Sequence, residues 1–454
     1  MQWQPRHFVG PIWSLEANRY ACFMNSNKIA LLPEYLLYLL ILLLPFEELN
    51  TFGGLAITKL VGLAFFICSM VDPKRFYGSI PSAFIVFALY ISIGMIIDIF
   101  SFPLEIASFN ALVRPLLMCV LMITTYNISI KNRLGRLVVA ICLSSLIYGI
   151  AQLFELGSAA TRIEGTVIDG VSADRIAVLG GDENFAACYI SLSVLAGIVY
   201  GFNRVPSRWR FRLPALAASV IGFYAILKTG SRGGMIALFV GIAGIALTAT
   251  KWTQRLKYAF VVAFLLAIMS VGLMESPSFK ARILSSVETG ETAGRTDIWT
   301  ESVRLFMDSP IYGFGYRMHQ FKLGERTGHE QRGTHNLFLS VLLGSGLLGF
   351  SLFLYFYSHS FKAIWLHKAE GINPIVFAWF LMALAASLSI NTEIAKWFWL
   401  LVALAFSAGK SRPAASIWKN RQPDHRGANW REPIASFSGP PFVARVCLEP
   451  EQTK

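Results

Sequence analysis

The sequence has few charged residues. Only 15% of its 454 residues are Asp, Glu, Lys or Arg, whereas 55% are hydrophobic and the mean hydropathy is +0.54. A soluble protein carries about a quarter charged residues, so this composition excludes an ordinary soluble protein. Apolar runs of about 17–23 residues recur between Ile29 and Phe406, each long enough to cross a hydrocarbon core of about 30 Å. The sequence therefore predicts an all-α polytopic integral membrane protein with about 12 transmembrane helices.

Patterns typical of disulfides, metal sites and repeats are also missing from the sequence. The six cysteines have no paired or metal-type spacing, and most lie in apolar runs. No cluster of histidines and carboxylates matches a ligand pattern, so we expect no metal and no cofactor. Residues 1–28 are polar and mixed, which indicates that no cleavable signal peptide is present. The absence of an internal repeat argues against an inverted-repeat transporter.

The net charge of +13 is distributed unevenly along the chain. Lys and Arg recur in alternate loops, for example at Lys74, Arg133 and Arg208, whereas the short loops 45–53 and 101–110 have neither. This is the positive-inside pattern, and it places both termini in the cytoplasm. The charge therefore reflects membrane topology and not binding to nucleic acid.

This topology divides the chain into five segments. They are a cytoplasmic lead (1–28), transmembrane helices 1–9 (29–274), one large periplasmic loop carrying short helices (275–334), transmembrane helices 10–12 (335–409) and a cytoplasmic, disordered tail (410–454). The spans are expected near residues 29–45, 54–71, 80–100, 110–126, 134–156, 184–202, 212–228, 233–250, 256–274, 335–357, 374–390 and 393–409.

Every even-numbered span then begins at the outer face of the membrane. Ser, Thr, Asn and Asp are preferred helix caps, and the free N–H groups at a helix start bind anions. Several such starts on one face, with arginines among them, predict a shared pocket. The starts that carry these residues are Asp182-Glu183-Asn184, Gly230-Ser231-Arg232, Thr334-His335-Asn336 and Asn391-Thr392-Glu393.

Three cations fall inside apolar spans, where a charge costs about 2.5–3.5 kcal/mol on insertion scales. Lys59, Arg114 and Lys396 each lie near the outer end of an even-numbered span. Snorkelling to the interface would explain each of them singly. Because the positive-inside bias depletes cations on this face, their joint placement predicts an anionic ligand at the outer leaflet. A lipid-linked pyrophosphate fits this requirement.

The large loop contains the candidates for chemistry. His335 lies at a loop-to-helix junction and, because imidazole titrates near pH 6.5, it can accept a proton at neutral pH, although it could instead be a helix cap. Arg295 begins a predicted amphipathic helix and could offer a planar fork to phosphate oxygens, or form a surface salt bridge with Asp297 or Glu291. His319 and His329 are interpreted mainly as structural.

The turn predicted over residues 310–316 contains aromatics that suit sugar stacking or the membrane interface. Two polar residues of the loop and its end, Arg317 and Asn336, are further candidates for binding the substrate, together with Asn184 and Ser231.

Several of these motifs, in this order, resemble the O-antigen ligase and polymerase superfamily. The resemblance covers roughly residues 180–350 and departs from the family at Glu183, where a proline is common. It rests on Asp182-x-Asn184, Gly230-Ser231-Arg232-Gly233-Gly234, Gly294-Arg295 with Ile298-Trp299, Pro310 to Phe321, and His335-Asn336-Leu337-Phe338-Leu339 with Gly346 and Gly349.

The resemblance implies a metal-independent, inverting transfer of a glycan from undecaprenyl pyrophosphate on the outer face of the bacterial inner membrane. Arg232 and Arg295 would hold the pyrophosphate of the donor, and His335 would activate a hydroxyl of the acceptor. These are the catalytic residues that we expect. The implied partners are the lipid-linked glycan donor, a lipid A-core or lipid-linked acceptor, and membrane lipids.

Ligase and polymerase differ in the acceptor, which is lipid A-core in ligases and a second lipid-linked repeat in polymerases. Polymerases are associated with two large outer loops that each carry Arg-x10-Gly. Here Arg304 with Gly315 and Arg317 with Gly328 fit this spacing within one loop, and residues 157–183 do not. One dominant loop favours a ligase, and an exopolysaccharide polymerase is the alternative. A lipid-linked-glycan transporter is less expected, because the unusual cations cluster at the outer end of the spans.

Overall fold

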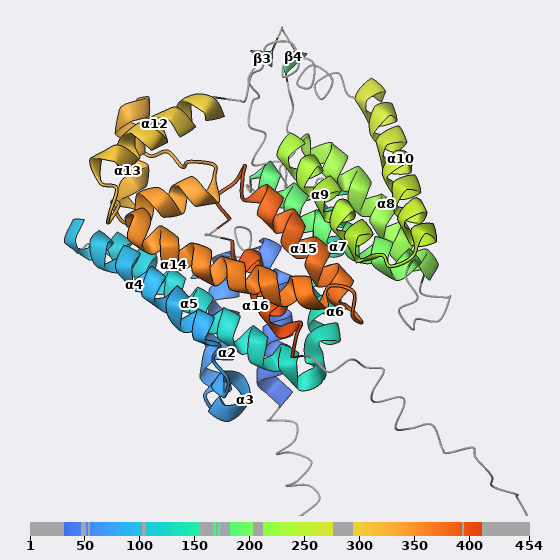
Figure 1. Cartoon of the computed structure of the whole chain (residues 1–454), viewed down its shortest axis with the longest axis horizontal. Coiled ribbons are helices and arrows are strands. Elements are labelled where there is room, and N and C mark those ends of the chain that lie inside the picture. Colours follow the sequence, from blue (N-terminus) through green and yellow to red (C-terminus); the bar gives the residue numbers. More distant parts are fainter. Residues whose placement is uncertain are drawn as a thin grey trace, which may run out of the picture. The chain divides into compact units, whose positions relative to one another are not determined.

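The computed structural model describes residues 31–46, 51–52, 55–101, 106–154, 156, 167–168, 171–172, 182–202, 212–275, 294–392 and 395–410. These residues are almost entirely helical, which confirms the predicted all-α fold (Figure 1). Two pairs of short antiparallel strands are additions to that prediction: β1 (Thr51–Phe52) with β2 (Leu55–Ala56), and β3 (Val167–Ile168) with β4 (Val171–Ser172). The predicted cytoplasmic lead, the tail beyond residue 410 and loop residues 276–293 lie outside the described residues.

The apolar helices follow the order of the predicted spans. They are a helix that begins at Leu31 and ends in the 3-10 turn η1 (Leu44–Phe46), α2 (Ile57–Ser69), α4 (Ser82–Ser101), α5 (Ile106–Ile128), α6 (Leu134–Leu153), α7 (Glu183–Phe202), α8 (Arg212–Thr229), α9 (Arg232–Thr248), α10 (Trp252–Glu275), α14 (Leu337–His367), α15 (Asn373–Ala386) and α16 (Lys396–Ser407). Shorter elements connect them: α3 (Pro73–Tyr77), the π-helical turn η2 (Ser129–Arg133), α12 (Arg295–Asp308) and α13 (Met318–Thr327).

Five of these helices are long and apolar enough to cross a membrane, and six more described helices are apolar but shorter. The chain is therefore a multi-pass membrane protein, while the total of about 12 spans stays a prediction. The five long spans are Ser82–Phe100, Leu134–Leu153, Glu183–Phe202, Trp252–Val271 and Leu337–His367.

Small residues allow α7, α9 and α15 to approach one another closely. A Cβ atom on Gly234 of α9 would lie 2.3 Å from the Cβ of Ala187 in α7, so only glycine fits at that contact. A Cβ atom on Gly244 would lie 2.9 Å from Leu381 Cδ1 in α15. Because helix–helix association in a membrane depends on such close packing, these contacts fix the starts of α7 and α9 beside each other.

Helix α14 is interrupted at Gly346, whose φ of 60° and ψ of −167° are not helical. A side chain is excluded there, because a Cβ atom would lie 2.2 Å from the carbonyl oxygen of Ile311. The helix expected over 335–357 thus begins at Leu337, breaks at Gly346 and continues to His367. At the break the ribbon of α14 changes direction (Figure 1).

The turn after α12 pairs with the main chain that the break exposes. The N–H groups of Phe314 and Gly315 donate to the carbonyls of Leu343 and Gly344, each at 2.8 Å, and Leu347 N–H donates to Pro310 at 2.8 Å. An interrupted helix can persist only where its released backbone groups find such partners. The predicted turn over 310–316 therefore supplies the hydrogen-bond partners of the backbone groups that the break in α14 leaves unpaired within the helix.

The predicted amphipathic helix is α12, and it packs with α13 against the first part of α14. Ile298 and Leu305 of α12, Leu323 of α13 and Leu343 of α14 form a small separate core. The indole N–H of Trp299 donates to the carbonyl of Thr334 at 3.0 Å. This packing holds the start of α12 close to the segment that precedes α14, and that segment carries His335.

Candidate functional site

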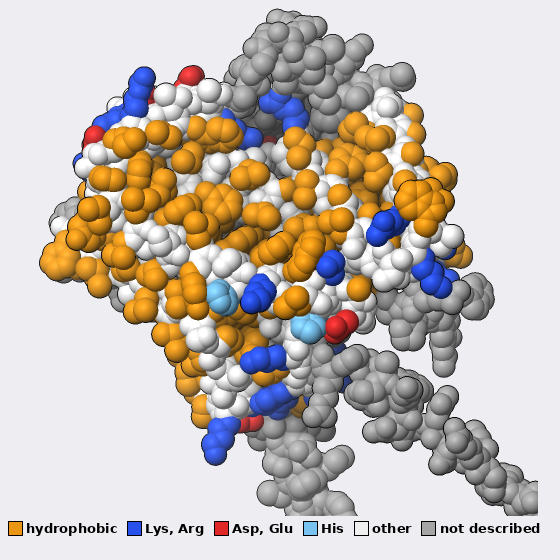
Figure 2. Space-filling model, viewed as in Figure 1, with side chains coloured by type: hydrophobic (Ala, Val, Ile, Leu, Met, Phe, Trp, Pro, Cys, Tyr) orange, Lys and Arg blue, Asp and Glu red, His pale blue; other side chains and the backbone are white. Residues whose placement is uncertain are grey.

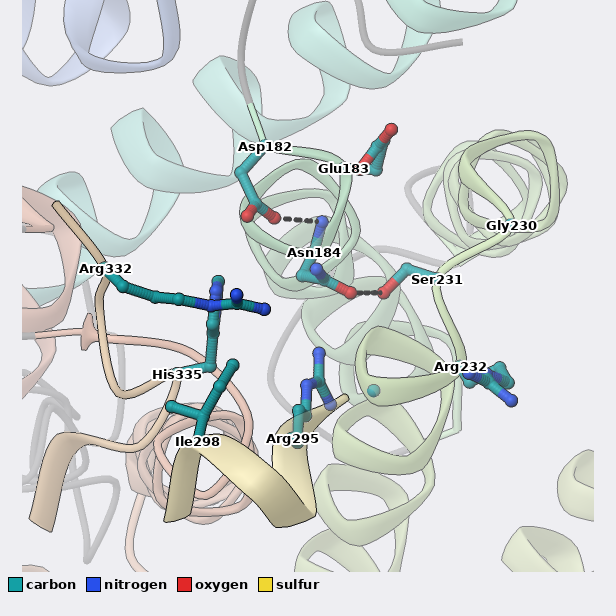
Figure 3. Close-up of a pocket in the computed structure, with 11 residues that line it drawn as sticks. Asp182, Glu183, Asn184, Gly230, Ser231, Arg232, Arg295, Ile298, Arg332 and His335 are labelled. Atoms are coloured by element: carbon teal, nitrogen blue, oxygen red, sulfur yellow. Dashed lines mark hydrogen bonds between the residues drawn. The ribbon is translucent and has the colours of Figure 1, made fainter. Parts of the chain in front are cut away.

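A cavity of about 210 Å³ opens where four separate segments of the chain meet (Figure 3). The segments are the start of α7, the turn before α9, the start of α12 and the stretch that precedes α14. Three of the four helix starts from which a shared pocket was predicted contribute residues to this cavity, and Asn391-Thr392-Glu393 does not. Its lining residues are Asp182, Glu183, Asn184, Gly230, Ser231, Arg232, Gly233, Arg295, Ile298, Arg332 and His335.

The starts of α7 and α9 are capped and linked to each other. The carboxylate of Asp182 accepts hydrogen bonds from the backbone N–H groups of Asn184 at 2.7 Å and Phe185 at 3.3 Å. Ser231 caps α9 by accepting from the N–H of Gly234 at 3.0 Å, and its hydroxyl donates to Asn184 Oδ1 at 2.7 Å (Figure 3).

His335 adopts a left-handed backbone conformation with φ of 49°, the one positive φ among the described residues that are not glycine. Such a conformation costs about 1–3 kcal/mol and persists only where surrounding contacts impose it. The residues on either side of His335 make these contacts. The Asn336 N–H and the Thr334 hydroxyl both donate to Asn391 Oδ1 at 3.0 Å, and Leu337 N–H donates to the Ser387 carbonyl at 2.8 Å.

The pKa of His335 lies below its ordinary value, chiefly because the ring is partly withdrawn from water. The positive charges of Arg295 and Arg332 lower this pKa further, whereas the negative charge of Asp182 raises it. The imidazole is consequently neutral at pH 7, which is the form that can accept a proton.

Three arginines line the cavity, and two of them reach toward His335. Arg295 is the first residue of α12, and Arg332 approaches the same place from the segment before α14 (Figure 3). One Nη atom of Arg332 lies 3.9 Å from the position that a Cβ of Gly294 would take. The side chain of Arg232 points away from the other two arginines (Figure 3). The Arg332 guanidinium also contacts the ring nitrogens of His329 at 2.8 and 3.0 Å.

The cavity gathers five of the residues predicted from the sequence, namely His335, Arg232, Arg295, Asn184 and Ser231. It also contains Arg332, which the sequence analysis did not single out. The signal available for it was modest: a cation three residues before His335, in the stretch that leads into a capped helix.

Four other predicted residues lie outside the cavity. Lys59 is exposed on α2, and Lys396 is the half-buried first residue of α16. Asn336 caps α14, its Oδ1 accepting from the N–H groups of Phe338 at 3.0 Å and Leu339 at 3.2 Å. Arg317 precedes α13, and its backbone N–H donates to Asp98 at 3.1 Å. Arg114, the last of the predicted residues, belongs to α5, and its side chain is outside the described part of the structure.

His319 is enclosed in the unit formed by α12, α13 and α14. Its Nδ1 lies 2.8 Å from the Gly315 carbonyl, and its Nε2 lies 3.2 Å from the Ser340 hydroxyl. Burial lowers the pKa of His319 to about 4, so the ring is neutral, with Nδ1–H donating to the carbonyl and Nε2 accepting from the hydroxyl. These contacts support the structural interpretation of this histidine.

No group of three or more His, Cys, Asp or Glu side chains is placed to hold a metal ion among the residues that the structure describes. The charged groups nearest to His335 in the cavity are instead arginines and the carboxylate of Asp182. A cavity lined by arginines and helix starts in a polytopic helical protein has the groups that suit an anionic ligand.

Comparison with known proteins narrows this class. Residues 217–354 match the family model described as O-antigen ligase, and this segment contains Arg232, Arg295, Arg332 and His335. The chain is also similar to the O-antigen ligase of Pseudomonas aeruginosa, with 24% identity over 202 residues, which cover 43% of this chain and 47% of the relative. The chain thus spans about half the length of the curated relative that it matches. These matches confirm the resemblance to the O-antigen ligase and polymerase superfamily, and they suggest a membrane glycosyltransferase of the ligase or polymerase type.

Proposed function

We propose that this chain is an O-antigen ligase-like glycosyltransferase. It transfers a glycan from undecaprenyl pyrophosphate to lipid A-core on the periplasmic face of the inner membrane. The observation that carries the proposal is the cavity in which neutral His335 lies with Arg295 and Arg332 beside the starts of α7 and α9.

The arginines serve the donor in this proposal. A guanidinium presents two parallel N–H groups that match two oxygens of a phosphate, and helix starts add further N–H donors. Negative charge develops on the pyrophosphate as its bond to the sugar breaks, and groups already oriented toward it stabilise that charge. Arg295 and Arg332 reach toward the centre of the cavity, so we assign them the pyrophosphate (Figure 3). Asn184 and Ser231 complete its binding site from the side of α7 and α9. Arg232 lines the same cavity, but its side chain points away from the other two arginines, so we give it a secondary part in holding the donor (Figure 3).

His335 serves the acceptor. Its imidazole takes the proton of a sugar hydroxyl, the hydroxyl oxygen attacks the anomeric carbon of the donor, and undecaprenyl pyrophosphate leaves from the opposite face. The anomeric configuration is therefore inverted. General-base assistance of this kind contributes about 10²–10⁴-fold to the rate. Because the arginines supply the positive charge at the leaving group, we propose that the transfer needs no divalent metal.

The remaining predicted binding residues receive a different role. Lys59 and Lys396 do not line the cavity, and Arg114 belongs to α5, so we propose that these three cations attract the lipid-linked donor along the outer leaflet. Asn336 caps α14 and so fixes the backbone directly after His335. Arg317 lies beside the buried carboxylate of Asp98 and stabilises the docking of α13 on α4.

An exopolysaccharide polymerase that joins lipid-linked repeats is the second candidate. The two Arg-x10-Gly spacings of the loop favour it, but neither Arg304 nor Arg317 lines the cavity. Arg304 instead forms an exposed ion pair with Glu301 at 2.5 Å on α12. The ligase remains the first candidate for this reason.

The test is glycan transfer by the purified protein with a lipid-linked donor, offered lipid A-core or a second lipid-linked repeat. We expect lipid A-core carrying the glycan, and we expect His335→Ala to bind the donor but to transfer nothing. In a deletion strain the ligase predicts free lipid A-core with accumulated polymer, whereas single-repeat products would identify the polymerase. If purified protein joins the donor to neither acceptor, the proposal is refuted.

A further inference from the structure

The unit formed by α12, α13 and the turn 310–315 has an apolar surface that no described part of the chain covers. Its six large apolar side chains are between 46% and 69% exposed, and clustered apolar side chains on a surface mark a site of contact with a protein or a membrane. We call this surface the apolar rim. It consists of Val303 and Met307 on α12, Ile311 and Tyr312 in the turn, and Leu347 and Leu348 on α14.

The two ends of the apolar rim are joined by main-chain hydrogen bonds. Leu347 N–H donates to Pro310 at 2.8 Å, and Leu348 N–H donates to Ile311 at 3.2 Å. The turn therefore lies at the same level as the first residues after the break in α14. The turn and the first residues after the break therefore lie at the same depth in the membrane.

The second part of α14, from the break at Gly346 to His367, has the length needed to cross the hydrocarbon core of a membrane. Leu347 to His367 is about 31 Å of helix, which equals the thickness of a hydrocarbon core of about 30 Å. Leu347 and Leu348 consequently lie at one boundary of that core, and Ile311 and Tyr312 lie beside them. Tyrosine is favoured at this depth, because its ring is apolar and its hydroxyl reaches the headgroups.

Helix α12 separates its polar and apolar residues in the way that this position demands. Val303 and Met307 lie on one exposed stripe of the helix. The charged side adjoins this stripe and carries ion pairs of Arg304 with Glu301 and of Asp308 with Arg326, each at 2.5 Å. Hydrophobic side chains cover α14 and continue over the α12–α13 region, and charged side chains gather at the far border (Figure 2). The apolar rim is thus continuous with the surface of a membrane-spanning helix.

We propose that the apolar rim is a membrane-docking surface that lies in the outer headgroup and acyl-chain boundary. Its occupant is the phospholipid bilayer, and the charged side of α12 faces water. Docking of this kind uses burial of apolar area and resembles that of interfacial helices. It would hold Arg295, at the start of α12, at the height where a lipid-linked headgroup emerges. The inference rests on the membrane-spanning α14 and not on the proposed glycan transfer.

The test places an environment-sensitive fluorescent amino acid at Met307 of the full-length protein, in nanodiscs of phosphatidylethanolamine and phosphatidylglycerol. The matched control carries the same amino acid at Arg304, on the charged side of the same helix. We expect emission from position 307 to be blue-shifted and quenched several-fold more strongly by brominated lipid than by aqueous iodide, with the opposite preference at position 304. A label at Ile311 should behave as at position 307, which guards against a local effect of one label.

Two outcomes would overturn the proposal. Equal quenching by iodide at positions 307 and 304 would show that the apolar rim faces water. Protection of position 307 from both quenchers, only when two copies share a nanodisc, would show that a second copy of the chain covers it. Because the measurement reads fluorescence and not transfer, its result is independent of the enzymatic activity.

Discussion

The side-chain oxygen of Asn391 accepts a hydrogen bond from the backbone N–H of Asn336 at 3.0 Å. It accepts a second bond from the hydroxyl of Thr334, also at 3.0 Å. Asn391 lies between α15 and α16, so the residues on both sides of His335 are held from another part of the chain. The strained backbone of His335 is thereby kept in the left-handed conformation that lets the residue line the cavity.

Replacing Asn391 should therefore disturb His335 without touching the donor. In Asn391→Ala both hydrogen bonds are lost, and at about 1 kcal/mol each we expect kcat to fall roughly tenfold or more. Donor affinity should stay unchanged, because Asn391 does not line the cavity. Asn391→Asp keeps an acceptor at the same place and should restore most of the rate. Equal kcat values for the wild type and Asn391→Ala would contradict this positioning role.

The pH dependence of transfer should follow the protonation of His335. Partial burial, Arg295 and Arg332 all lower its pKa, so the neutral base persists below the ordinary titration range of histidine, and activity is lost only on further acidification. Arg332→Ala removes a lowering influence and should move the acid limb of the rate profile to higher pH. Asp182→Asn removes a raising influence and should move it to lower pH. The measurement is kcat against pH, and shifts in the same direction for both variants would contradict the assignment.

Lysine should not replace the arginines that face the pyrophosphate. A lysine ammonium is a point charge and lacks the planar fork that binds two oxygens, so we expect Arg295→Lys and Arg332→Lys to weaken donor binding and to slow transfer by roughly 10–100-fold. Arg232→Lys should cost less than either, because the side chain of Arg232 points away from the other two arginines (Figure 3). Arg304→Lys is the matched control, because Arg304 is exposed, pairs with Glu301 and does not line the cavity. Near-normal transfer by Arg295→Lys would show that the positive charge alone suffices.

His319 should make the fold sensitive to acid. Its pKa is lowered from 6.5 to about 4 by burial, so below pH 6.5 the unfolded chain binds a proton that the folded chain does not. Stability should be complete above pH 6.5 and fall between pH 6.5 and 4, by up to roughly 3 kcal/mol. The Tm of the purified protein from pH 7 to pH 5 measures this loss. A His319→Gln variant should be less stable at pH 7 but lose less stability on acidification; an unchanged pH slope would contradict the explanation.

Removal of divalent metal ions should leave glycan transfer intact. Because arginines occupy the place of a divalent ion in the proposed mechanism, transfer in membranes should survive EDTA at a rate close to that of untreated samples. The control is a metal-dependent glycosyltransferase assayed in the same membranes. Loss of transfer with EDTA, together with its recovery on addition of Mg²⁺ or Mn²⁺, would mean that the arginines have been given the wrong role.

Much of the architecture is determined locally by the sequence. Long apolar runs predict helices, because a chain in lipid must satisfy its backbone hydrogen bonds within each segment. The caps Ser231 and Asn336 bond to backbone N–H groups two or three residues further on, and α12 begins at Arg295 directly after Gly294. The structure has each of these helix starts where the sequence indicates. His335, Arg232 and Arg295 could be selected for the same reason, since each stands at such a start.

What the tertiary structure decided is which of these local features meet. Arg332 joins the cavity, and Lys59 and Lys396 do not, because the packing of α7, α9 and α15 at small residues and the docking of α12 on α14 bring together segments far apart in the chain. The break at Gly346 depends on hydrogen bonds with a turn more than 30 residues earlier, as in the bond from Leu347 to Pro310. A hydropathy profile shows one unbroken apolar run over this part of α14. It reports how favourably a segment partitions into lipid, and it contains no information on hydrogen bonds between that segment's backbone and a distant turn.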